Sequence, residues 1–272
     1  MIKSSWLWRI LGTATLVCLL ALLVGFGWAL RDTWFPPGGM ALPGASPTAS
    51  PTGEDLTMKE EVLITAVGDS LTVGTGDATG NGYVKGVTAG LVKALDKPVR
   101  TINNLGINGL RADQLVQRLD ERGYRNSLGK ADIILFTIGG NDLFQIAQNG
   151  GSMTEGGGDL SLELLKASMP EAKQRLKAVF AKIREMNASA RLVYVGLYNP
   201  FYDVPEMRPG SQYISEWNSY AHNLAEADGN ATVVPTYDLF EDKIAKYLSS
   251  DHFHPNAQGY ARIAERIVQA LY

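Results

Sequence analysis

The chain is poor in cysteine and histidine and has no block of charges of one sign. Cys18 is the single cysteine among 272 residues, so no disulfide can form within the chain. Because zinc is usually held by several histidine or cysteine side chains, three histidines without an HExxH pattern predict that no metal is bound. The net charge is -3, and this weak, mixed charge argues against a nucleic-acid partner.

Charged residues are also missing from residues 10–30, a stretch of about twenty residues that matches the length of a membrane-spanning helix. Lys3 and Arg9 precede it, which favours an N-terminus in the cytoplasm and a protein body on the outer side of the cell membrane. We therefore predict a membrane anchor over residues 1–35. A signal peptide, with secretion after its cleavage, is the alternative, although no small-x-small cleavage site follows Leu30.

The rest of the chain predicts a linker and one α/β domain. Residues 36–60 are rich in proline, glycine, serine and threonine, a composition that cannot bury a core and predicts a linker. Over residues 61–272, apolar runs of strand length alternate with segments of helical periodicity, which predicts a parallel sheet in a three-layer α/β/α domain. The expected strands are residues 62–67, 99–104, 133–138, 192–197 and 232–234, and the expected helices are residues 83–95, 112–122, 160–186, 215–227 and 256–271. The glycine-rich residues 148–159 are expected to form a loop near the site, either a lid or a plain insertion.

A serine and two glycine-bearing turns follow the first three expected strands. Ser70 lies in a GDSL sequence directly after the first strand, where a helix N-terminus would stabilise an alkoxide and a developing oxyanion. Helix capping by Asp69 or Ser70 is the alternative explanation for these residue types. Gly106 and Asn141 follow the next two strands, and a glycine N–H and an asparagine amide are suitable oxyanion donors. Because the C-terminal ends of parallel strands meet at one edge, we expect these groups to converge.

Asp251 and His254 lie three residues apart near the C-terminus, a spacing that lets the carboxylate hold the imidazole in one tautomer. A serine hydroxyl is a poor nucleophile unless an imidazole takes its proton and a carboxylate stabilises the imidazolium. The sequence therefore predicts Ser70, His254 and Asp251 as a catalytic triad. His222 and His252 are expected to be structural or surface residues.

With these motifs in this order, residues 61–272 resemble the GDSL or SGNH hydrolases. The four residues that name the family stand here as Ser70 in GDSL, Gly106 in NLGING, Asn141 in GGND and His254 in DHFHP. The resemblance implies a flavodoxin-like, five-stranded parallel sheet, the triad of Ser70, His254 and Asp251, and oxyanion donors at Ser70, Gly106 and Asn141. It also implies ester hydrolysis through an acyl-serine intermediate, with no metal and no organic cofactor. The longer sequence GDSLTVGTGD looks most like the lipase/acylhydrolase branch of Gram-positive bacteria that carries an N-terminal anchor.

We therefore expect a monomeric serine esterase or lipase whose substrate is a small or cell-surface ester, such as an O-acetylated wall polysaccharide, a phospholipid or a lysophospholipid. A membrane-tethered module that binds cell-wall glycan or lipid without turnover is the alternative. The sequence leaves the acyl chain length open. Five aromatic residues either line an acyl or sugar pocket or pack in the core: Tyr83, Tyr198, Phe201, Tyr202 and Tyr213.

Overall fold

The structure is a computed structural model that describes residues 4–34, 56–147 and 161–272. The chain divides into two compact units, Met1–Thr48 and Ala49–Tyr272. Most of the predicted linker and the glycine-rich residues 148–159 lie outside the described residues, so these two predictions stay predictions.

The first unit contains the helix α1 (Ser4–Trp34). Its stretch Trp8–Trp28 has 21 residues and a mean hydropathy of 2.3, which makes it long and apolar enough to cross a membrane. A signal sequence near the N-terminus would have the same properties. The apolar helix predicted from residues 10–30 is thus present, and it fits either an anchor or a signal peptide.

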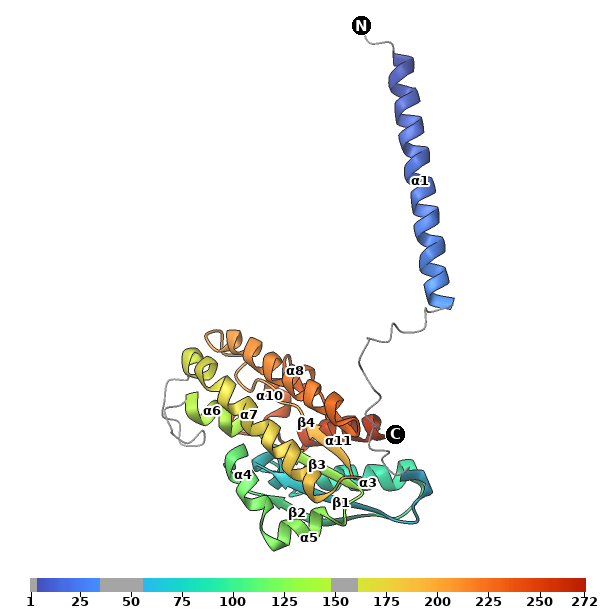
Figure 1. Cartoon of the computed structure of the whole chain (residues 1–272). Helices are drawn as coiled ribbons and strands as arrows, with labels where there is room; N and C mark the ends of the chain where they lie inside the picture. Colours follow the sequence, from blue (N-terminus) through green and yellow to red (C-terminus); the bar gives the residue numbers. More distant parts are fainter. Residues whose placement is uncertain (1–3, 35–55, 148–160) are drawn as a thin grey trace. The chain divides into compact units, whose positions relative to one another are not determined.

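The second unit is built on a five-stranded parallel sheet with the strand order β2-β1-β3-β4-β5 (Figure 1). This is the flavodoxin-like order, and the predicted fold class is confirmed. Each strand agrees with its predicted range to within about two residues at either end. The strands are β1 (Val62–Gly68), β2 (Val99–Gly106), β3 (Ile133–Thr137), β4 (Arg191–Val195) and β5 (Ala231–Val234).

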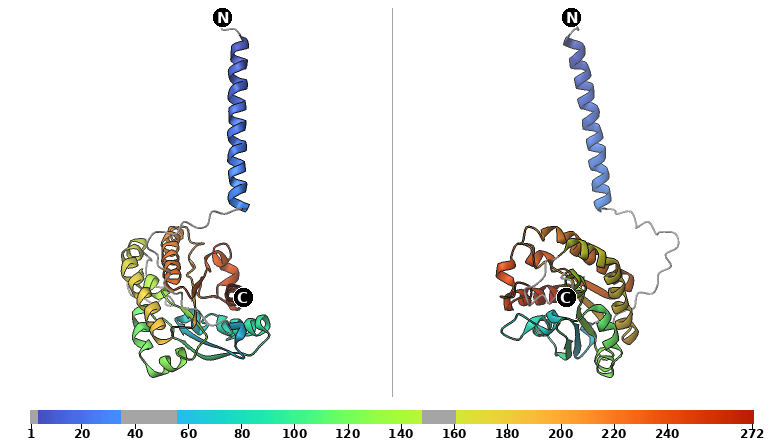
Figure 2. Two further views of the ribbon diagram at one scale, coloured as in Figure 1. Left: turned by 45° about the vertical axis from the view of Figure 1, so that its right-hand side comes forward. Right: turned by 90° about the vertical axis from the view of Figure 1, so that its left-hand side faces the viewer.

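Helices cover both faces of the sheet, and the side chains of each strand alternate between two hydrophobic clusters. Ile64 and Ala66 of β1 belong to one cluster, whereas Val67 of the same strand belongs to the other. The rotated views show the sheet between these two helical layers (Figure 2). The longer helices are α3 (Gly82–Leu95), α4 (Ala112–Leu119), α5 (Arg122–Leu128), α6 (Gly140–Ala147), α7 (Leu162–Met186), α8 (Ser211–Asp228) and α11 (Ala257–Leu271). The short ones are α2 (Ser70–Val73), α9 (Tyr237–Phe240), α10 (Ile244–Tyr247) and the 3-10 turns η1 (Leu56–Met58) and η2 (Arg208–Gly210).

The predicted single helix over residues 112–122 is wrong at its C-terminal end. Helix α4 ends at Leu119, and Glu121 adopts an extended backbone with φ -69° and ψ 142° before α5 begins at Arg122. Leu119 and Leu128 are both fully buried in the same cluster. Each of the two short helices thus buries a leucine near its C-terminal end in this cluster.

Candidate active site

Ser70 lies where the chain leaves the inner strand β1, between β2 and β3, and enters the short helix α2. Asp69 is the N-cap of α2, and its Oδ1 accepts a hydrogen bond from the Leu71 N–H at 3.1 Å. The capping explanation is therefore correct for Asp69, and it leaves the neighbouring Ser70 side chain available. Ser70 is only 4% exposed. This position is at the C-terminal edge of the sheet, beside the point where the strand order reverses, and that is where ligands of open α/β sheets bind.

The fold brings Ser70 and His254 into contact although 184 residues separate them. Ser70 Oγ lies 2.8 Å from His254 Nε2, and His254 Nδ1 lies 2.6 Å from Asp251 Oδ2. Both distances are within hydrogen-bonding range, so the three side chains form one continuous chain of hydrogen bonds. This arrangement is the one that activates a serine hydroxyl as a nucleophile.

Asp251 is held in its ionised form. Partial burial acts to raise the pKa of its carboxyl, but hydrogen bonds from the His254 ring and from nearby donors outweigh that effect and lower the pKa to about 2. Its Oδ1 accepts from the Ser249 hydroxyl at 2.7 Å and from the backbone N–H groups of Phe253 and His254 at 3.0 and 2.9 Å. A carboxylate beside Nδ1 favours the proton on that nitrogen, which leaves the Nε2 lone pair directed at Ser70.

The loop that carries His254 is fixed by contacts on two sides. Tyr198 donates its hydroxyl to the Phe253 carbonyl at 2.7 Å. On the other side Gly76, from the loop after α2, approaches so closely that an added Cβ would lie 2.9 Å from the His254 Cβ. The imidazole is therefore positioned by packing as well as by Asp251.

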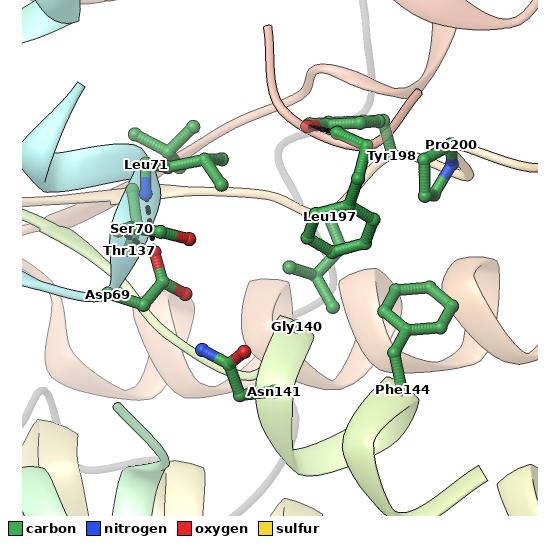
Figure 3. A pocket seen from close by; sticks show the side chains of 12 residues that line it. Asp69, Ser70, Leu71, Thr137, Gly140, Asn141, Phe144, Leu197, Tyr198 and Pro200 are labelled. Atoms are coloured by element: carbon green, nitrogen blue, oxygen red, sulfur yellow. Dashed lines mark hydrogen bonds between the residues drawn. The ribbon is translucent and has the colours of Figure 1, made fainter. Parts of the chain in front are cut away.

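Asn141 and Gly106 lie around the same serine. Asn141 is the second residue of α6, and its side chain lines the same pocket as Ser70 (Figure 3). The Asn141 amide has two N–H groups, and one of them donates from Nδ2 to the Leu110 carbonyl at 2.9 Å. Gly106 packs against α2, where an added Cβ would lie 2.7 Å from the Val73 nitrogen, so a side chain is excluded there.

The Gly106 N–H has a partner that the motif did not predict. It donates to Asn104 Oδ1 at 3.1 Å, while Asn104 Nδ2 donates to the Thr72 carbonyl at 2.7 Å. For Gly106 to serve as an oxyanion donor, Asn104 must release or share this hydrogen. Asn104 lies two residues before Gly106 in the same NLGING motif, and that spacing is typical of an asparagine side chain that binds nearby backbone.

Two buried acids stand beside the site. Burial raises the pKa of Asp69. Hydrogen bonds from the Thr137 hydroxyl, at 2.6 Å, and from the Leu71 N–H lower this pKa, but their effect is smaller than that of burial. Burial likewise raises the pKa of Asp142, next to Asn141, to about 6. Among residues 4–34, 56–147 and 161–272, no group of three or more acidic, histidine or cysteine side chains is placed to hold a metal.

A pocket with mostly apolar walls opens beside Ser70 (Figure 3). Of the five aromatic residues considered from sequence, Tyr198 lines it, whereas Tyr83 is fully buried in the core. The motifs do not single out Phe144, although it lies three residues after Asn141 and so shares its helix face. The lining residues are Asp69, Ser70, Leu71, Thr137, Gly140, Asn141, Phe144, Val195, Leu197, Tyr198, Pro200 and Phe253.

The other two histidines lie elsewhere. His252 Nε2 pairs with the Asp203 carboxylate at 3.1 Å on the surface, and His222 is an exposed residue of α8. His252 has a left-handed backbone with φ 56°, and this turn directs its ring away from the neighbouring His254. Neither side chain contacts Ser70.

The domain thus combines a three-layer α/β/α fold with a serine, a histidine and an aspartate joined by hydrogen bonds, an arrangement that serine hydrolases share. Residues 66–262 match the model of the GDSL-like lipase/acylhydrolase family. The chain belongs to this family, as the sequence motifs predicted. Membership supports ester hydrolase activity.

Similar proteins agree with this assignment. The chain is 36% identical over 218 residues to the uncharacterized protein YpmR of Bacillus subtilis, covering 78% of this chain and 82% of that protein. It is 30% identical over 222 residues to the spore germination lipase LipC of Bacillus licheniformis, covering 76% of this chain and 95% of that protein. The crystal structure of the lipase Lip_vut3 from a goat rumen metagenome is similar with a TM-score of 0.64 and 26% identity, covering 77% of this chain and 97% of that one.

Proposed function

We propose that the protein is a serine esterase that hydrolyses carboxylic esters through an acyl-Ser70 intermediate. The observation that carries this proposal is the continuous hydrogen-bonded chain from Ser70 Oγ to His254 to Asp251, at 2.8 and 2.6 Å. The names of two similar proteins, a spore germination lipase and a rumen lipase, agree with ester chemistry.

In the first half of the reaction, His254 Nε2 takes the Ser70 proton while Oγ attacks the ester carbonyl carbon. Asp251, ionised at neutral pH, stabilises the resulting imidazolium. His254 then gives the proton to the departing alcohol oxygen as the carbon–oxygen bond breaks, which leaves the acyl group on Ser70. Water, deprotonated by the same imidazole, releases the acid and restores the serine.

The carbonyl oxygen becomes negatively charged during both attacks and needs hydrogen-bond donors. We assign as donors the Ser70 N–H, at the first position of α2, and the second N–H of the Asn141 amide, because both residues line the pocket. Gly106 is the third proposed donor, and it acts when its N–H turns from Asn104 to the oxyanion. Loss of one such donor typically lowers turnover on the order of 100-fold to 1000-fold.

Localisation belongs to the same proposal. We infer that α1 anchors the chain in the cell membrane, with the catalytic unit on the outer side, because Lys3 and Arg9 precede the uncharged residues 10–30 of this apolar helix. Secretion after removal of a signal peptide is the alternative. In either case the monomeric enzyme would meet esters outside the cytoplasm.

Variants of Ser70 and His254 test the activity directly. We expect Ser70→Ala and His254→Ala to lower kcat on p-nitrophenyl acetate by about 10⁴-fold or more, because each removes a group that acts as part of one unit. His222→Ala is the matched control, since that histidine is exposed on α8 and contacts neither side chain. Parent-like activity in Ser70→Ala would refute the proposal and leave a binding module without turnover as the better description.

A further inference from the structure

The pocket beside Ser70 has one polar side and one apolar side. Ser70 and Asn141 face it from one side, and Leu197, Tyr198, Pro200 and Phe144 face it from the other (Figure 3). An ester bound with its carbonyl at Ser70 therefore directs its acyl chain toward aromatic and aliphatic walls, because apolar surface is stabilised when it leaves water. The apolar side is the natural receptor for the acyl part of the substrate.

The space between these walls is small. The free volume is about 20 Å³, room for about one water-sized group. The methyl group of an acetyl ester is close to that size, whereas a longer chain must either displace a wall or extend through the open side of the pocket into water. Protein interiors are packed so closely that one added methylene is felt energetically.

The walls are held in place by contacts among themselves. The Tyr198 ring stacks on Phe240 with centroids 4.1 Å apart, and its hydroxyl is bonded to the Phe253 carbonyl. The Phe253 ring packs edge-on against Phe144 at 6.0 Å. A longer chain cannot move Tyr198 or Phe253 without disturbing the loop that carries His254.

Phe144 differs from the other aromatic walls. It lies one turn beyond Asn141 on α6 and is 4% exposed, and its ring closes the pocket opposite Ser70 (Figure 3). Its side chain makes no hydrogen bond, and it does not belong to the loop of His254. Phe144 contacts that loop through the Phe253 ring, but it lies on a separate element and makes none of the hydrogen bonds of Ser70, His254 and Asp251.

We propose that this pocket selects short acyl groups, acetyl above all, and that Phe144 sets the upper limit on chain length. The substrate class that follows is acetyl and other short-chain esters, with long-chain lipid esters as poorer substrates. This inference rests on the proposed esterase activity and adds the acyl specificity to it.

The test measures kcat/KM of the full chain on p-nitrophenyl acetate, butyrate, octanoate and palmitate, each corrected for the rate of Ser70→Ala. We expect acetate to exceed butyrate by on the order of 10-fold or more, and octanoate and palmitate to react still more slowly. Phe144→Ala and the milder Phe144→Leu should raise the butyrate-to-acetate ratio on the order of 10-fold, with the larger effect in the alanine variant.

Phe180→Leu is the matched control for Phe144→Leu. Phe180 is 5% exposed and belongs to the same hydrophobic cluster, but it does not line the pocket. The Phe180→Leu variant should lose about as much free energy of unfolding as Phe144→Leu, and it should keep the parent's preference for acetate. Hydrolysis that depends on Ser70 but favours octanoate or palmitate, or an acyl preference unchanged in both Phe144 variants, would overturn the inference while leaving the esterase proposal intact. If no ester shows hydrolysis that depends on Ser70, the esterase proposal itself fails.

Discussion

Asp142 stands next to a proposed oxyanion donor and is fully buried. Its Oδ2 accepts from the Ala112 N–H at 2.9 Å, which ties the start of α4 to the start of α6. Its Oδ1 has no hydrogen-bond partner among the described residues, and the nearest guanidinium atom, Arg175 Nη1, lies 3.6 Å away, beyond hydrogen-bonding distance. Burial without full pairing raises the pKa of Asp142 to about 6.

This raised pKa predicts a pH-dependent cost to stability. Between about pH 4 and pH 6 the folded state holds the Asp142 proton more tightly than the unfolded chain, so the free energy of unfolding decreases as pH rises through this window. The loss is complete above about pH 6 and amounts to about 3 kcal/mol at most. We expect Asp142→Asn, which stays neutral and keeps an acceptor for Ala112, to match the parent at pH 4 and to be more stable at pH 8.

Urea unfolding of the parent and Asp142→Asn at both pH values measures this difference. Other acids titrate equally in both proteins, so they cancel in the comparison. A stability difference that is the same at pH 4 and pH 8 would contradict the raised pKa of Asp142.

The role proposed for Asp251 predicts an effect on turnover, not on stability. We expect Asp251→Asn to lower kcat by on the order of 10⁴-fold with little change in KM, because an amide no longer favours the His254 tautomer whose Nε2 accepts the Ser70 proton. Steady-state kinetics on p-nitrophenyl acetate measure the effect. A variant within about tenfold of the parent would show that Asp251 does not orient or stabilise the imidazole.

At the scale of elements, the loop after α2 and the loop that carries His254 pack directly against each other. Gly76 has a left-handed backbone with φ 91°, and a Cβ there would lie 2.6 Å from the Pro255 carbonyl oxygen and 2.9 Å from the His254 Cβ. Real Cβ atoms do not approach so closely, so a side chain at Gly76 must displace the histidine loop. The GDSLTVGTGD motif thus contains both the proposed nucleophile, Ser70, and a residue that supports its proposed base, His254.

Gly76→Ala should therefore lower kcat by at least on the order of 100-fold, since a shift of about 1 Å at the base is costly to catalysis. Gly80→Ala is the control, because Gly80 also has a positive φ, of 66°, but a Cβ there meets nothing within 4 Å. Both variants should lose about 1 to 2 kcal/mol of stability from backbone strain, which thermal unfolding will report. Equal activity in the two variants would show that the contact with His254 does not matter for turnover.

Elements were predictable from sequence where burial follows a simple period. The strands are continuous apolar runs because both faces of the sheet are covered, and all five were located. The break after Leu119 was missed, because tertiary burial of α5 decides it.

The order of the motifs predicted that Ser70, Asn141 and His254 lie close together, and the fold brings them to the same edge of the sheet. The Asn104 contact to Gly106 and the closing of the pocket by Phe144 depend on side-chain packing, which spacing along the chain does not reveal.

At the scale of the whole molecule, the proposed catalytic residues, the pocket and both hydrophobic clusters all belong to the unit Ala49–Tyr272. Helix α1 contributes to none of them. Its apolar side chains are exposed, with Leu22 at 72% and Trp28 at 70%, which suits a lipid environment.

We expect a chain shortened to residues 56–272 to keep kcat/KM on p-nitrophenyl acetate within about threefold of the full chain. The shortened chain should remain in the supernatant after ultracentrifugation, whereas the full chain should require detergent to leave the membrane fraction. Loss of activity on shortening, in a protein that still unfolds cooperatively, would contradict the assignment of all catalytic groups to the second unit.

The most direct test of the central claim is labelling with a fluorophosphonate, which reacts only with a serine that a base has activated. Incubation of the full chain, digestion and mass spectrometry should find the phosphonyl group on the peptide that contains Ser70. Labelling should be abolished in His254→Ala and preserved in His222→Ala. An intact, folded protein that takes up no label at Ser70, or one labelled equally without His254, would contradict the triad on which the proposed function depends.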